Sequence, residues 1–420
     1  MKSRFLFVFQ AVFFAGIFFA GDAFGQQDKL PEIVAKNRTQ LMLKEGRFSG
    51  TAAPVLEKAL AESQFVLIGE EHGTEQVPAF VSAVCNVVGP GGFHTMAVEA
   101  GPRAAAAIQP WIGSPNSREQ LAQFEKKYPD TIAFFNLQPE LDLLSHCAAV
   151  ARGGTFQVWG LDQEFMGASG YLLTSILETH PGKQARAETE RLVAKNEEAR
   201  NKAAQSGNPG ELFMMSASDS DLAGLRELLQ KEGDATAQAL LGELMESREI
   251  YYKNASAGAE SNRQRALLMK RNFVRNYQAT ARAEGAVPKI LMKFGDWHLY
   301  RGFNPLLNND IGNTMAELAD GMGMKSLHIA ILAVKGTRLR FAGIGRPYQP
   351  ETFRLLDDKD YQFLQPMVDH LEPSGWTMFD LRGIRNATGH GTLDRDMERL
   401  VLGYDLLILI PDSTASTQIR

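Results

Sequence analysis

The sequence has little of what several classes of protein require. Among its 420 residues only Cys85 and Cys147 are cysteines, too few for a disulfide scaffold or for a cysteine-rich zinc or iron–sulfur site. Positive charge is not in excess, because 44 Lys and Arg stand against 49 Asp and Glu, so nothing indicates a nucleic-acid partner. With 44% hydrophobic and 22% charged residues, the composition is that of a globular protein.

Several familiar catalytic motifs are also missing. The sequence contains no Gly-x-Ser-x-Gly nucleophile elbow, no Gly-x-x-x-x-Gly-Lys-Ser/Thr phosphate loop and no His-Glu-x-x-His zinc motif. These absences disfavour ordinary serine hydrolases, P-loop enzymes and zincin peptidases. Any chemistry must therefore use a different arrangement of side chains.

The first 25 residues are organised like a secretory signal peptide. Lys2 and Arg4 precede an apolar stretch over residues 5–20, and Ala23-Phe24-Gly25 offers small residues at the positions that signal peptidase recognises. A retained membrane anchor is the alternative, but a spanning helix usually needs about 20 apolar residues. We expect cleavage before Gln26, export to the periplasm or the medium, and no stable membrane insertion afterwards. Outside the cytoplasm the two cysteines could pair, or they could be buried free thiols.

Short apolar segments alternate with helical patterns along the rest of the chain. The segments are rich in β-branched and aromatic residues and are bounded by turn or cap residues, as strands buried on both faces are. This alternation predicts an α/β fold with a mostly parallel central sheet flanked by helices. The predicted strands cover residues 65–69, 95–99, 156–162, 290–295, 327–334, 376–380 and 406–410, and the clearest predicted helices cover 76–88 and 137–152.

Residues 183–283 interrupt the alternation. This segment contains 16 Lys and Arg, 14 Asp and Glu, and leucines at helical spacing. We expect an inserted antiparallel bundle of three or four helices, with turns near Asn208-Pro209-Gly210 and Gly258. Its charges fit solvated helix faces, and a lid over a substrate site is the functional alternative. The predicted organisation is thus a signal peptide (1–25), the first part of an α/β domain (26–182), the helical insertion (183–283) and the second part of the α/β domain (284–420).

Ionisable residues follow four predicted strands at the point where each strand ends. Gly69-Glu70-Glu71-His72 follows the first strand, Glu99 ends the second, Asp162 the third, and Asp296-Trp297-His298 follows the fourth. The carboxyl ends of parallel strands meet at one edge of the sheet, where ligands bind. Buried charges cost free energy unless they are paired, so this cluster indicates catalysis or metal binding. The remaining histidines lack such a setting and are predicted to be structural or exposed: His94, His146, His180, His328, His370 and His390.

Taken in order, these motifs resemble those of the erythromycin esterase family, and more broadly its superfamily with ChaN-like haem-uptake proteins and Tiki-type metallopeptidases. The resemblance covers about residues 60–415. It implies an α/β sheet with an inserted helical bundle and a cleft lined by Glu and His, where water opens a lactone ester. The motifs that carry it are Gly69-Glu70-Glu71-His72-Gly73-Thr74, Val98-Glu99, Gly160-Leu161-Asp162, Asp296-Trp297-His298 and Tyr404-Asp405-Leu406-Leu407-Ile408-Leu409-Ile410.

Carried over to this chain, the resemblance implies that His72 is the general base, with Glu70 and Glu99 orienting it or the water. His298 would bind the substrate or stabilise the oxyanion. Further candidates for substrate binding are Glu71, Arg103, Asp162 and Tyr300. We therefore predict an exported hydrolase that cleaves an ester or related acyl bond of a small-molecule substrate.

Two alternatives stay open. Glu70, His72, Glu99 and His298 are all acceptable ligands for zinc, manganese or cobalt, so a divalent metal could activate the water. By analogy with the ChaN-like branch, the protein could instead bind haem or an iron ligand, with Tyr171, Tyr300 or His298 at the mouth of the cleft.

Overall fold

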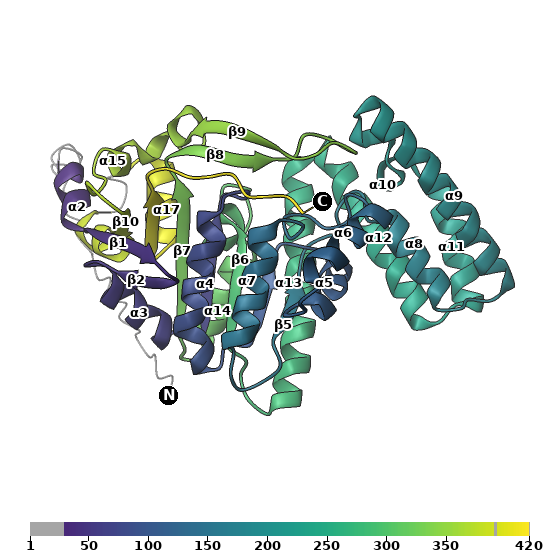
Figure 1. The fold of residues 1–420 in the computed structure, drawn as a ribbon, viewed down its shortest axis with the longest axis horizontal. Helices are drawn as coiled ribbons and strands as arrows, with labels where there is room; N and C mark the ends of the chain where they lie inside the picture. The colour runs from purple at the N-terminus through teal and green to yellow at the C-terminus, as the bar shows by residue number, and fades with distance from the viewer. Residues whose placement is uncertain (1–28, 390–392, 420) are drawn as a thin grey trace, which may run out of the picture.

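The computed structural model describes residues 29–389 and 393–419, so the predicted signal peptide and His390 lie outside the described residues. The protein has an α/β fold built on a nine-stranded sheet with the order β2-β1-β10-β11-β7-β3-β6-β4-β5 (Figure 1). The strands of this sheet are β1 (Arg38–Lys44), β2 (Arg47–Ser49), β3 (Phe65–Glu70), β4 (Thr95–Val98), β5 (Gln157–Gly160), β6 (Ile290–Gly295), β7 (Ser326–Ala333), β10 (Trp376–Asp380) and β11 (Leu406–Ile410).

The sheet is mostly parallel. β11, β7, β3, β6, β4 and β5 all pair in parallel, whereas β10 runs antiparallel to both β11 and β1. All seven predicted strands are present in this sheet, which confirms the predicted fold class. The central β3 lies between β6 and β7, so residues that follow β3, β6 and β4 come out side by side at one edge of the sheet.

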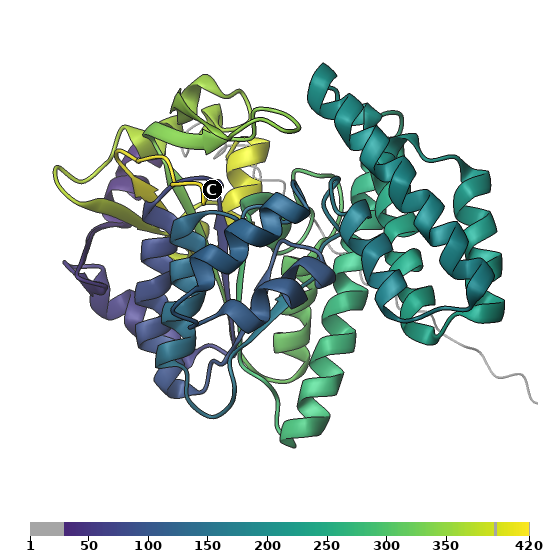
Figure 2. The same ribbon diagram turned by 45° about the vertical axis from the view of Figure 1, so that its right-hand side comes forward.

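Helices cover both faces of the sheet (Figures 1 and 2). One face packs against α3 (Ala53–Glu62), α4 (Gln76–Val88), α5 (Pro102–Ile108) and α7 (Gln138–Val150). The other packs against α13 (Gly258–Glu284), α14 (Ile311–Gly321), α16 (Leu381–Ala387) and α17 (Arg395–Gly403). Three more helices add buried side chains to the two layers: α6 (Ser117–Lys127) on the first face, and α2 (Leu30–Lys36) and α15 (Gln365–Val368) on the second.

A disulfide joins two of the helices that cover one face of the sheet. Cys85 of α4 and Cys147 of α7 are bonded, with their Cα atoms 5.3 Å apart. The structure therefore resolves the choice between paired cysteines and free thiols in favour of the pair. Both sulfurs lie in the apolar layer between the helices and the sheet, which also contains Phe80 and Leu144.

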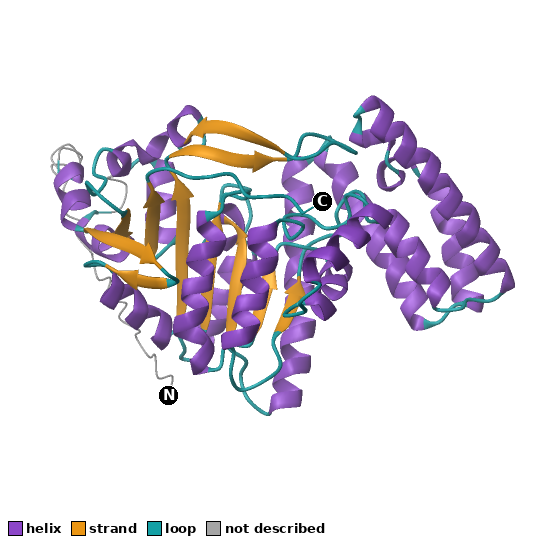
Figure 3. Cartoon of the chain, viewed as in Figure 1, coloured by secondary structure: helices purple, strands orange, loops and turns teal. Residues whose placement is uncertain are grey.

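A helical bundle projects from one end of the sheet (Figure 3). Its hydrophobic core includes Leu192, Leu225 and Leu241. Leu172 of α8 belongs to the same core, so α8 packs with the helices that follow it. Ser218 and Asp234 cap two of these helices with their side chains. The helices are α8 (Ser169–Glu178), α9 (Lys183–Ser206), α10 (Phe213–Ser216), α11 (Asp219–Glu232) and α12 (Ala235–Asn254). The long α13 then leads from the bundle back to the sheet, where Met269 and Phe273 join the core.

A hairpin of β8 (Lys335–Arg340) and β9 (Gln349–Arg354) crosses above the sheet toward the bundle (Figure 1). In the loop that joins β8 to β9, Ile344 is buried against Ala203 and Leu212 of the bundle segment. The hairpin thus connects the sheet to the bundle. Across the described part of the chain, no helix combines the length and the apolar character that crossing a bilayer would need.

Candidate active site

Five ionisable side chains form a continuous row at the carboxyl ends of three neighbouring strands. Glu70 ends β3 and His72 lies two residues beyond it, while Glu99 directly follows β4. His298 lies in the short 3₁₀ helix η4 (Asp296–Leu299) that follows β6, and Asp310 caps the start of α14. We call Glu70, His72, Glu99, His298 and Asp310 the charge row.

The charge row alternates carboxylates with imidazoles. His72 Nδ1 lies 2.9 Å from Glu70 Oε1, and His298 Nδ1 lies 2.8 Å from Asp310 Oδ2. The two Nε2 atoms both face Glu99, at 3.3 Å from Oε2 for His72 and 3.4 Å from Oε1 for His298. Each imidazole is therefore oriented by a close carboxylate on Nδ1, and its Nε2 faces a centre that the two rings share.

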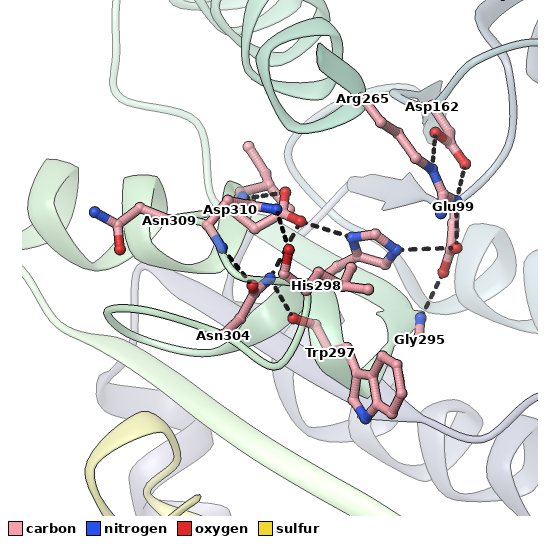
Figure 4. Close-up of polar contacts among 12 residues, drawn as sticks. Glu99, Asp162, Arg265, Gly295, Trp297, His298, Asn304, Asn309 and Asp310 are labelled. Carbon is pink, nitrogen blue, oxygen red and sulfur yellow. Dashed lines mark hydrogen bonds and ion pairs between the residues drawn. The ribbon is translucent and has the colours of Figure 1, made fainter. Parts of the chain in front are cut away.

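Glu99 is held at that centre by groups from other parts of the chain (Figure 4). The backbone N–H of Gly295 donates to Oε2 at 2.6 Å, and Arg265 of α13 donates to Oε1 at 2.7 Å. Arg265 also binds Asp162, with Nε 2.8 Å from Oδ1. Asp162, which the sequence predicts for substrate binding, thus reaches the charge row through an arginine of the bundle-side helix.

The charges in the row perturb the proton affinity of both imidazoles. Burial opposes protonation of His72, but hydrogen bonds and charges from Glu70 and Glu99 outweigh it and raise its pKa to about 9. Burial also opposes protonation of His298, and the charges of Asp310 and Glu99 overcome it and raise the pKa to about 10. Burial favours the neutral form of Glu99, but the imidazolium of His298 holds its pKa well below the usual range. The resting site therefore contains two imidazolium ions at neutral pH.

An aromatic ring covers His72. The ring of Phe134 stacks on the imidazole with centroids 3.7 Å apart and an angle of 18° between the planes. Phe134 has a φ of 61°, in the left-handed region that a bulky side chain adopts at a cost of about 1–3 kcal/mol. The side chain of His72 keeps 25% of its exposure, whereas those of Glu99 and His298 keep 6%. Solvent therefore reaches the row beside His72.

Asp296 connects the charge row to the core below it. Its carboxylate accepts from the hydroxyl of Tyr361 at 3.1 Å, and its backbone carbonyl accepts from the hydroxyl of Tyr404. Burial raises the pKa of Asp296 to about 7. A side chain at Gly69 would collide with the Tyr404 hydroxyl and come within 2.8 Å of Asp296 Cα. Gly69, Asp296 and Tyr404 belong to three separate motifs of the sequence, and in the fold these three residues pack against one another.

Other predicted site residues lie around the row and not within it. Glu71 pairs with Arg338 of the β8–β9 hairpin. Arg103 forms a two-pronged ion pair with Glu243 of α12, with Nε 2.6 Å from Oε2 and Nη2 3.0 Å from Oε1. Both contacts connect the loops at the edge of the sheet to the elements above it.

The two tyrosines considered as haem ligands pack against other aromatic rings. Tyr300 is 3% exposed and packs on Tyr404, and it lines a cavity of about 310 Å³ together with Trp297. Tyr171 packs against Phe124 and Tyr128. A role of Tyr300 in substrate binding would depend on the cavity beside Trp297.

The donor atoms of the row do not fit a metal centre. Each nitrogen of His72 and of His298 faces a carboxylate oxygen, and the position that the two Nε2 atoms share is taken by Glu99. Within residues 29–389 and 393–419, no three His, Cys, Asp or Glu side chains are arranged to hold a metal ion. The metal-assisted variant therefore has no support in the geometry of the predicted ligands.

Four of the histidines outside the row have local partners, and His180 is exposed. His328 is buried against the carbonyl of Leu299, and burial lowers its pKa to about 3. His94 contacts Glu284, His146 contacts Asn86, and His370 contacts the carbonyl of Pro366.

Comparison with known proteins defines the class of fold. No family model matches the sequence, and no curated protein does. Among solved structures, an erythromycin esterase, the histidine-to-asparagine variant of EreC in its open conformation, matches with a TM-score of 0.59 at 14% identity over 91% of this chain and 99% of that one. A Bacillus cereus protein matches with a TM-score of 0.56 at 15% identity, and a succinoglycan biosynthesis protein with 0.55 at 13%. Each of these two matches covers 94% of this chain and 99% of the other. The chain therefore has the fold of these proteins.

Proposed function

We propose that the protein is a hydrolase that uses the charge row to add water to an ester or related acyl bond of a small molecule. The observation that carries the proposal is the arrangement of two carboxylate–imidazole pairs whose Nε2 atoms face one centre. Acyl transfer to water needs a base beside the water and a hydrogen-bond donor where the oxyanion forms. Two oriented imidazoles supply both groups.

The two imidazoles have different tasks in this mechanism. Neutral His72, oriented by Glu70, removes a proton from water at Nε2 while the water oxygen attacks the acyl carbon. His298, kept protonated by Asp310, donates through Nε2 to the carbonyl oxygen as negative charge develops there. Collapse of the tetrahedral intermediate expels the alkoxide, which takes the proton from His72. Arg265 and the Gly295 N–H hold Glu99, so that its carboxylate stabilises the imidazolium forms.

The fold supports the choice of an ester bond. One protein of the same fold is an erythromycin esterase, and its solved structure is that of a variant in which a histidine is replaced by asparagine. At 14% identity this likeness extends to the fold alone, so the nature of the acyl group rests on the site.

Site-directed variants test the proposal. Wild-type protein is assayed with a panel of p-nitrophenyl esters and macrocyclic lactones, and H72N, H298N and E99Q are compared with it. We expect each variant to lose about 10²-fold or more in kcat/KM while keeping its circular dichroism spectrum. H370N is the matched control, because the side chain of this half-buried histidine contacts the carbonyl of Pro366, outside the charge row, and the activity of H370N should be unchanged. Full turnover by folded H72N would refute the role of His72.

We also propose that the protein is exported after cleavage before Gln26. The basic residues, apolar stretch and small residues of the leader support this, and the Cys85–Cys147 disulfide is typical of an oxidising compartment. Mass spectrometry of the protein expressed with its full leader tests the proposal. An N-terminus at Gln26 in the extracytoplasmic fraction is expected, and an intact leader on cytoplasmic protein would contradict it.

A further inference from the structure

A lysine is buried beneath the charge row. Lys293 lies within β6, where it is in register with Ile68 of β3 and Val98 of β4, and it is 2% exposed. Its ammonium group binds Glu70 Oε1, the atom that also accepts from His72, and lies 2.8 Å from Glu140 Oε1 of α7. The side chains of Glu70 and Glu140 are also almost fully buried. Three charged groups thus form a buried triad directly behind His72.

Burying this triad in the core costs free energy that apolar side chains would not. Removing charges from water costs several kcal/mol for each ion, and apolar side chains of similar volume often serve stability as well or better. The triad is also incompletely satisfied, because Glu70 Oε2 and Glu140 Oε2 are buried without a hydrogen-bond partner. Stability therefore does not account for a lysine in the middle of an otherwise apolar strand.

The surroundings of the triad keep its charges in contact. Phe135 lies beside the Lys293 ammonium, 5.5 Å from the ring centroid, while the preceding Phe134 covers His72. Burial raises the pKa of Glu140 to about 7, and the nearby charge of Glu70 adds to that effect while Lys293 opposes it. Burial also opposes ionisation of Glu70, and Lys293 and His72 together lower its pKa. The charge of Glu70 consequently depends on Lys293, and that of Lys293 is shared with Glu140.

We propose that Lys293 and Glu140 are positioning residues that fix the charge of Glu70 and thereby set how readily His72 takes up and releases its proton. Neither residue touches the centre that the two imidazoles face. The inference rests on the proposed function only for its consequence in catalysis, because the effect on His72 exists in the free protein.

Single substitutions of either partner of Glu70 in the triad should lower the pKa of His72. E140Q removes an anion that is ionised above pH 7, so the pKa of His72 should fall by about 0.5 or more from its value near 9. K293M removes the cation that keeps buried Glu70 ionised, so Glu70 takes up a proton and the pKa of His72 should fall as well. The fall should be larger than in E140Q, because Glu70 is the carboxylate that contacts His72 Nδ1.

Nuclear magnetic resonance measures these shifts without any substrate. The imidazole ¹⁵N shifts of full-length protein labelled in histidine are followed from pH 6 to 10.5, and the His72 signal is the one that disappears in H72N. E164Q is the matched control, because Glu164 is equally buried but binds the backbone N–H of Arg103, and it should leave His72 unchanged. E140Q keeps the shape of the side chain and decides the matter alone if K293M does not fold.

An unchanged His72 pKa in E140Q, or a rise of that pKa in K293M, would overturn the inference. The activity experiment is separate from this one. With an ester that the wild type hydrolyses, the acid limb of kcat/KM should move with the NMR value. If the wild type hydrolyses no ester, the proposed function fails while the NMR titration still decides the role of the triad.

Discussion

His72 and His298 are held by the same kind of carboxylate contact, yet their proton affinities differ, and this difference sets the pH dependence of the proposed reaction. A base must be neutral and an oxyanion donor must be protonated. With a pKa of about 9, only about 1% of His72 is neutral at pH 7. His298 keeps its proton until about pH 10.

We therefore expect kcat/KM for an ester to rise with pH up to about 9 and to fall above about 10. The two limbs belong to the coupled pair and not to isolated side chains. A pH–rate profile between 6 and 11, with a pH-matched blank for spontaneous hydrolysis, measures them. An acid limb near pH 6.5, the value of an ordinary histidine, would show that His72 is not the base in this environment.

Gly69 offers a second prediction for a single residue. A methyl group there would collide with the hydroxyl of Tyr404 and approach Asp296 Cα to 2.8 Å. We expect G69A to lower the free energy of unfolding by about 1–3 kcal/mol, measured by urea denaturation. The matched control is G224A in α11, where a methyl group meets no atom within 4 Å and should stabilise the helix by about 0.5–1 kcal/mol. Equal stability of G69A and wild type would show that the motif glycine is not needed for packing.

The sequence predicts part of the site and misses the rest for a physical reason. Glu70, His72, Glu99 and His298 are visible because each follows or ends an apolar strand. Their partners are not, because Arg265 and Asp310 lie in helical or loop segments where charged residues are ordinary. Lys293 is the exception: a lone lysine within an apolar strand is a signal that could have been noticed.

At the scale of elements, α13 is the link between the bundle and the site. Its Arg265 reaches Glu99 and Asp162, and its positive charge also lowers the proton affinity of His298. The helical segment was expected to carry solvated charges or to act as a lid. The structure gives it a third property, because one of its arginines is part of the charge network.

We expect R265M to reduce kcat/KM for an ester at least about tenfold and to move the basic limb of the pH profile upward, because His298 loses a neighbouring cation. The matched control is R271M on the same helix, since Arg271 pairs with Glu246 at the surface. Hydrogen exchange of α12 and α13 should increase in R265M alone. Activity and exchange equal to wild type would remove Arg265 from the network.

Strands were predicted where they are buried on both faces and missed where they are not. β3, β6 and β11 are apolar and almost fully buried. β2 has three residues, and β8 and β9 are partly exposed, with the polar sequences KGTRLR and QPETFR. Such strands exist because a neighbouring strand or loop offers hydrogen bonds, which the local hydrophobic pattern does not record. The helical insertion also shares its core with α8, whose apolar residues resemble those of any sheet-covering helix.

At the scale of the whole molecule, the disulfide constrains the unfolded chain more than the site. Closing the 62-residue separation between Cys85 and Cys147 should stabilise the fold by about 2–4 kcal/mol. We expect the C85S/C147S double variant to unfold at a correspondingly lower urea concentration. Its ester hydrolysis at 25 °C should match that of the wild type. Adding a reductant to the wild type should lower its stability to urea by the same amount. Identical stability with and without the disulfide would contradict this account.

The pairing of the central strand dictates how the protein can be made. Within the described sheet, β3 forms strand hydrogen bonds only with β6 and β7. Phe65 therefore cannot pair until Ile290 and Ser326 have been synthesised. A nascent chain that has emerged only as far as the bundle lacks both partners of this strand. A half-built site therefore cannot form, and the site should be completed in one late step, once β6 and β7 are present.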